Sequence, residues 1–143
     1  MVVRELDAGI HETIMAHCAR GDKLAAARAF EEAISEYNKA LELVPEPKNE
    51  WNASTWILAA IADSAFLAGY KTSAREALQY VMTCPGALGN AFLHLRLGEV
   101  LLDDGEKDAA ANELMRAYMA AGKEIFQSED PHYFEFLKSR AKI

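Results

Sequence analysis

A pattern of small and apolar residues recurs three times along the chain, and this repetition limits the fold more than any other feature. In the first copy Gly21 is followed by Ala33 and Tyr37 at intervals of 12 and 4 residues. Ala33, Ala74 and Ala110 occupy equivalent positions, so successive copies are 41 and 36 residues apart. A period of about 34 residues is typical of stacked helix pairs, which bury their apolar faces against one another.

The second and third copies keep small residues where paired helices must approach closely. Gly69 and Gly105 fall at the turn inside their pairs, where a glycine tolerates a positive φ, whereas the first copy has Arg28 there. The other matching positions are Ala62, Leu78, Val81 and Gly86 in the second copy, and Gly98, Leu101, Leu114, Ala117 and Gly122 in the third.

Helical periodicity extends over the whole chain. Apolar residues recur at helical spacing over residues 6–43, 53–67, 74–82 and 92–126, without sustained alternation of period two. Breaks that contain proline, glycine or asparagine divide these runs. The pattern predicts an all-α chain of seven helices, with Asn52, Asn90 and Asp130 as N-caps and Pro131 in the first turn of the last helix.

These units resemble the tetratricopeptide repeat family over roughly residues 14–124. The resemblance implies a right-handed α-α superhelix (a solenoid) of three helix pairs, at about residues 14–47, 55–88 and 91–124. A capping helix at about residues 131–141 would close it. Its apolar residues Tyr133, Phe134, Phe136 and Leu137 alternate with Glu135, Lys138 and Arg140, as expected of a terminal helix with one solvated face. We expect a single domain over residues 1–143.

Charge and hydropathy limit the classes of partner and the cellular location that we expect. The net charge of −7 and the pI near 5.1 disfavour binding to nucleic acid or anionic lipid. The stretch Trp56–Tyr70 is too short to span a membrane and contains Asp63, so we expect a buried helix there. The segment Met1–Asp7 has no apolar leader, which predicts a cytoplasmic protein.

The sequence offers no pattern for catalysis or for a cofactor. His11 and His17 are six residues apart and therefore lie on different sides of a helix, so they cannot share a metal ion. Cys18 and Cys84 have no second cysteine at metal-binding spacing, and we expect both to pack in the core. We therefore predict no enzyme, no catalytic residue, no metal site and no cofactor.

In the tetratricopeptide family the first helix of each pair lines a concave surface that receives peptides or partner helices. An acid follows the small residue of that helix in every copy, and Asp22, Asp63 and Glu99 would then form a row along this surface. The other residues that we predict for this partner-binding groove are Met15, Cys18, Trp56, Ala59, Phe66, Phe92, Leu95, Arg96 and Asp103.

Acids beside aromatic residues favour a basic, partly apolar polypeptide as the partner. The alternative for these residues is structural, with solvated carboxylates and aromatic rings that pack between repeats. The clamp for C-terminal carboxylates known in some family members is not matched, because Cys18, Asp22, Ala60 and Phe92 replace its residues and only Arg96 fits.

Two other functions remain open at this point. A compact acidic protein could be an immunity protein or inhibitor that covers the basic cleft of a toxin or enzyme. The chain could also be a homodimeric scaffold, with an isologous patch built from aromatic residues. That patch would contain Trp51, Trp56, Tyr133, Phe134 and Phe136.

Overall fold

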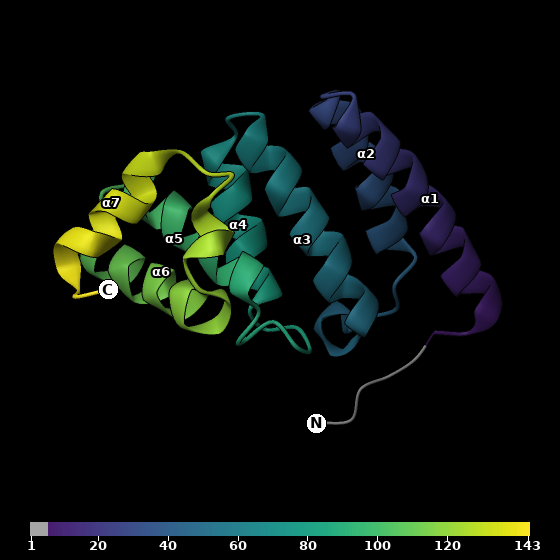
Figure 1. The fold of residues 1–143 in the computed structure, drawn as a ribbon. Helices are drawn as coiled ribbons and strands as arrows, with labels where there is room; N and C mark the ends of the chain where they lie inside the picture. Colours follow the sequence, from purple (N-terminus) through teal and green to yellow (C-terminus); the bar gives the residue numbers. More distant parts are fainter. Residues whose placement is uncertain (1–5) are drawn as a thin grey trace. The chain divides into compact units, whose positions relative to one another are not determined.

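A computed structural model describes residues 6–143, and within that range the regular structure is all helical, which confirms the predicted all-α class and the seven helices (Figure 1). Met1–Glu5, the larger part of the segment in which we found no leader, lies outside the described residues. The helices are α1 (Ala8–Ala26), α2 (Phe30–Glu42), α3 (Asn52–Leu67), α4 (Lys71–Val81), α5 (Ala91–Asp103), α6 (Lys107–Ala121) and α7 (Pro131–Arg140), with short 3-10 helices η1 (Lys48–Glu50) and η2 (Lys123–Phe126).

The chain divides into two compact units, Met1–Ala87 and Leu88–Ile143. The first unit holds α1 to α4 and the second holds α5 to α7. The single domain that we expected over residues 1–143 stays a prediction. No helix of the described residues has both the length and the apolar character needed to cross a bilayer.

Three helix pairs, α1–α2, α3–α4 and α5–α6, share one turn geometry. The turn residue has a positive φ in each pair, at 63° for Arg28, 87° for Gly69 and 81° for Gly105. The amide that follows it donates to the carbonyl five residues back, at 2.8 Å, 2.8 Å and 2.9 Å respectively. The repeat register therefore located all three turns, including the one without glycine.

Close helix approaches also recur at equivalent positions. A β-carbon on Gly21 would lie 2.6 Å from Cε1 of Tyr37, and one on Gly98 would lie 2.7 Å from Cγ of Leu114. Both pairs are separated by 16 residues, and the second is offset from the first by 77 residues. The first and third helix pairs therefore pack through the same contact.

In the first unit α3 is the central helix, packed against α2 and α4 (Figure 1). Its buried side includes Ile57, Leu58 and Ile61, as expected for the most apolar stretch of the chain. The predicted N-cap is wrong, because Trp51 takes the cap position with extended backbone and Asn52 is already helical. The preceding helix η1 brings the chain into α3 one residue earlier than the asparagine signal indicates.

In the second unit the C-terminal helix covers the α5–α6 pair. Leu137 of α7 and Phe126 of η2 are buried with Leu95, Leu114 and Ala117 in one apolar cluster. The predicted caps are confirmed here, because Oδ1 of Asn90 accepts from the Leu93 amide at 3.1 Å. Oδ1 of Asp130 likewise accepts from the His132 amide at 3.0 Å, with Pro131 in the first turn.

Candidate functional site

A pocket of about 470 Å³ opens in the first unit, between the first helices of its two pairs. Its volume lies within the range of about 300–1,000 Å³ typical of ligand sites. Four of the predicted groove residues line it, and it also includes residues that we had not selected. The lining consists of His11, Met15, Cys18 and Asp22 of α1, Tyr37 of α2, and Trp56 and Ala60 of α3.

The polar side of the pocket is a hydrogen-bonded pair. The hydroxyl of Tyr37 donates to Oδ1 of Asp22 at 2.6 Å, and the tyrosine is only 3% exposed. Burial raises the pKa of Tyr37, and the hydrogen bond to Asp22 and the charges of Asp22 and Asp63 raise it further. The phenol therefore stays protonated as a fixed donor that orients the exposed Asp22 carboxylate.

Asp63 acts on the same tyrosine as Asp22. Both carboxylates raise the pKa of the Tyr37 hydroxyl electrostatically, although they come from different helices, α1 and α3. Two of the three acids that the repeat register aligned therefore influence one buried phenol. They give this part of the surface a negative potential.

Apolar side chains flank the acid. Met15 is 48% exposed and Trp56 is 38% exposed, although both are large hydrophobic residues. Cys18 is buried beside them, and burial, followed by the charge of Asp22, raises the pKa of its thiol to about 11. The thiol is thus protonated at neutral pH and is not a nucleophile. The pocket therefore combines an exposed carboxylate with apolar side chains that remain accessible.

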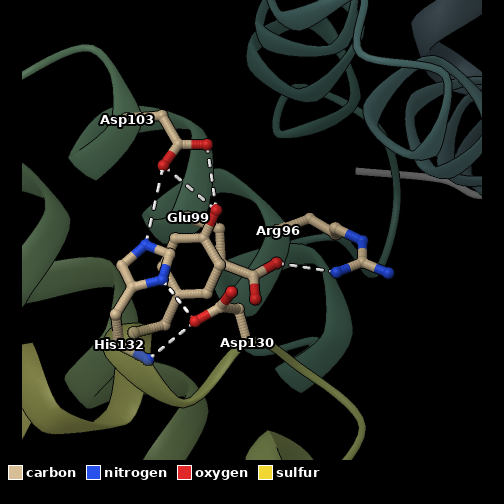
Figure 2. A network of polar contacts seen from close by, with 6 residues as sticks. Arg96, Glu99, Asp103, Asp130 and His132 are labelled. Carbon is tan, nitrogen blue, oxygen red and sulfur yellow. Dashed lines mark hydrogen bonds and ion pairs between the residues drawn. The ribbon is translucent and has the colours of Figure 1, made fainter.

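The third acid of the predicted row has a different environment. Glu99 is fully buried in the second unit, where Nη1 of Arg96 donates to its Oε1 at 2.7 Å (Figure 2). The same Nη1 donates to Glu129, from the segment that leads into α7. The expectation that Glu99 and Arg96 line an exposed surface is therefore wrong, because the chain's own C-terminal segment packs onto α5.

Burial raises the pKa of Glu99 to about 8, and a hydrogen bond to Glu129 raises it as well, while Arg96 opposes both effects. Two carboxyl groups share one guanidinium here, so a proton held by Glu99 removes the repulsion between them. The cluster therefore favours the protonated form of Glu99 more than water does.

A second set of polar contacts joins α7 to the end of α5. The hydroxyl of Tyr133 donates to both carboxylate oxygens of Asp103, at 3.0 Å and 2.9 Å. His132 lies with Nε2 3.9 Å from Asp103 and Nδ1 2.6 Å from Asp130 (Figure 2). Asp103, another predicted groove residue, thus anchors the C-terminal helix.

The remaining predicted groove residues differ in exposure. Leu95 belongs to the buried cluster of the second unit, so its assignment to an exposed surface is wrong. Ala59, Phe66 and Phe92 are half-buried. Of the five aromatic residues suggested for a dimer patch, Tyr133 is buried and Trp51, Phe134 and Phe136 are half-buried, which leaves Trp56 as the exposed one.

Sequence reasoning missed a polar pair that occurs twice. Nδ1 of His17 lies 2.9 Å from Glu36, and Nδ1 of His94 lies 2.6 Å from Glu113. Each pair joins the two helices of its hairpin, and the second pair is offset from the first by 77 residues, like the glycine contacts. A comparison of the first and third copies for polar residues at equal offsets would have revealed it.

The side chains of residues 6–143 form no group of three or more His, Cys, Asp or Glu placed to hold a metal ion. No protein-family model matches the sequence, and no curated protein is similar to it.

Proposed function

We propose that the chain is a non-catalytic protein-interaction module of the tetratricopeptide type. Three helix pairs with one turn geometry, and two pairs with the same glycine contact, support the repeat assignment. The lengths of these pairs and the capping helix that follows them agree with a short solenoid.

The partner that fits is a basic, partly apolar polypeptide, bound in the pocket of the first unit. One observation carries this proposal: the exposed carboxylate of Asp22 is held in place by Tyr37 in a pocket that two exposed apolar side chains, Met15 and Trp56, also line. The acid attracts and orients a cation, and the flat apolar area takes the carbon chain that carries it. The net charge of −7 adds long-range attraction.

Fluorescence anisotropy with labelled peptides tests the proposal. The peptides should share one apolar content and differ in net charge from strongly basic to strongly acidic. Basic peptides should bind best, and their affinity should fall by about tenfold between low salt and about 0.5 M salt, because screening weakens the attraction. Binding that ignores both peptide charge and salt would contradict the proposal.

Matched variants locate the binding. Asp22→Asn should weaken binding by about tenfold, since a hydrogen bond to a charged group is lost. Glu12→Gln removes the same charge from an exposed position of α1 outside the pocket and should change affinity by less than about twofold. Equal effects of the two variants would exclude the pocket as the site.

A further inference from the structure

The first helix of each sequence copy has similar residue types at the positions equivalent to the pocket residues of α1. A large apolar residue (Met15, Trp56 or Phe92) is followed seven residues later by an acid (Asp22, Asp63 or Glu99). The residue between them, four after the apolar one, is Ala19 in the first copy, Ala60 in the second and Arg96 in the third. Only the third copy therefore supplies its own cation at this position.

The second unit shows how that cation is held. The guanidinium carbon of Arg96 lies 5.2 Å from the centroid of the Phe92 ring. Its Nη1 donates to Glu99 at 2.7 Å (Figure 2). The aromatic ring and the acid of one helix thus contact a single guanidinium, to which Glu129 adds a second carboxylate. Both interactions favour arginine, whose planar group stacks and donates at the same time.

The first unit has the acid and the apolar side chain but lacks the cation. Ala19 and Ala60 occupy the position that Arg96 has in the third copy, and Ala60 lines the pocket. Among the described residues, no lysine, arginine or histidine forms an ion pair with Asp22, which is contacted by the Tyr37 hydroxyl. Trp56 from α3 contributes an exposed aromatic ring to the same pocket.

We propose that this pocket binds an arginine side chain of a partner polypeptide, in the way that the second unit holds Arg96. The inference rests on the proposed function and makes it more specific, from a basic partner to one that presents arginine. The guanidinium donates to Asp22, whose Oδ1 is already fixed by Tyr37, and its flat face lies against Trp56 or Met15. The fixed carboxylate suits a planar fork of donors better than the compact ammonium of lysine.

Short peptides of one sequence test this with the full chain. The probe is acetylated, amidated Ala-Leu-Arg-Leu-Ala, compared with versions that carry lysine or the neutral isostere citrulline in the centre. The readout is the indole resonance of Trp56 in proton–nitrogen NMR, with the indole of Trp51 as internal reference. The arginine peptide should bind at least about fivefold tighter than the lysine peptide, and the citrulline peptide should give no saturable shift.

A variant of the chain provides a second, independent measurement. Ala60→Arg places a guanidinium in the pocket lining, at the position equivalent to Arg96, and should occupy the pocket from within, which lowers the affinity for the arginine peptide by at least about tenfold. Ala16→Arg adds the same charge at an exposed position of α1 outside the pocket and should lower the affinity by less than about threefold.

The outcomes separate this inference from the proposed function. Equal binding of the arginine and lysine peptides overturns the preference for arginine and leaves the basic-partner function standing. Equal loss of affinity in Ala60→Arg and Ala16→Arg overturns the comparison with Arg96. Absence of any Trp56 shift with both basic peptides overturns the proposed function and this inference together.

Discussion

Gly21 lies so close to Tyr37 that a β-carbon on the glycine would stand 2.6 Å from Cε1 of the ring. The ring cannot withdraw easily, because it is buried and its hydroxyl is bonded to Asp22. Gly21→Ala should therefore lower the free energy of unfolding by about 1–3 kcal/mol, despite the better helix propensity of alanine. Urea denaturation followed by circular dichroism measures the change.

The matched control for this substitution is Gly9→Ala, also in α1. Its new β-carbon would meet only Oδ1 of Asp7, at 3.6 Å, so stability should change by less than about 1 kcal/mol. Gly98→Ala should be as harmful as Gly21→Ala or more so, because the backbone nitrogen of Leu114 is also within 3.0 Å. Equal losses of stability in Gly9→Ala and Gly21→Ala would show that the close approach of Tyr37 is not the reason for a glycine at position 21.

Arg28 occupies a backbone conformation that suits glycine, with φ at 63°. Arg28→Gly should raise the free energy of unfolding by about 0.5 kcal/mol, because relief of the left-handed conformation outweighs the added freedom of the unfolded chain. The reverse test is Gly105→Ala, which should lower it by about 1 kcal/mol. Thermal unfolding of both variants measures these changes in stability. An Arg28→Gly protein that is less stable than the unchanged chain would contradict the prediction.

The buried Glu99 makes stability depend on pH. Because its pKa is higher in the folded chain, at about 8, than the usual value of about 4.3 in the unfolded chain, the folded state binds more protons between these values. The free energy of unfolding should therefore decrease as pH rises from about 5 to about 8. Glu99→Gln cannot lose this proton and should flatten the decrease, which urea titrations across that pH range would measure.

Exposed Glu135 provides the control for that pH dependence. Glu135→Gln removes a surface carboxylate that pairs only with Lys138 among its described contacts, and the slope should stay as in the unchanged chain. If the free energy of unfolding of Glu99→Gln decreased with pH as steeply as that of the unchanged chain, another group would be the one that binds the proton.

Cys18 should resist alkylation in the folded chain. A pKa near 11 in place of 9.0 reduces the thiolate fraction at neutral pH by about 100-fold, and burial hinders access further. Iodoacetamide should therefore react at least about 100-fold more slowly with the native chain than with the chain in urea, as mass spectrometry of the Cys18 peptide would show. Asp22→Asn should change the native rate little, because burial is the larger cause of the shift.

Much of the fold was predictable because it depends on local signals that repeat. The three turns were located by register, and Asn90 and Asp130 were recognised as caps by residue type. The start of α3 was misplaced because an asparagine caps equally well one residue earlier or later, and only the path of η1 decides. The turns and two of the three N-caps were therefore predictable from local sequence, whereas the exact start of α3 was not.

The candidate site was predicted only in part, because it depends on contacts distant in sequence. Register placed Asp22 and Trp56 on equivalent faces, and the structure brings both into one pocket. The repeat register could not reveal that Arg96 donates to Glu129, 33 residues later in the sequence, or that Glu99 is buried. No periodic pattern encodes such a contact, since the C-terminal segment lies outside the repeats.

The attachment of α7 to α5 and α6 determines where this array could grow. Because Leu137 and Phe126 already cover Leu114 and Ala117, a further hairpin joined directly after α6 would compete with them for the same apolar surface. An additional helix pair would therefore have to be inserted before α5. The pair α5–α6 would then keep η2 and α7 as its C-terminal covering segment.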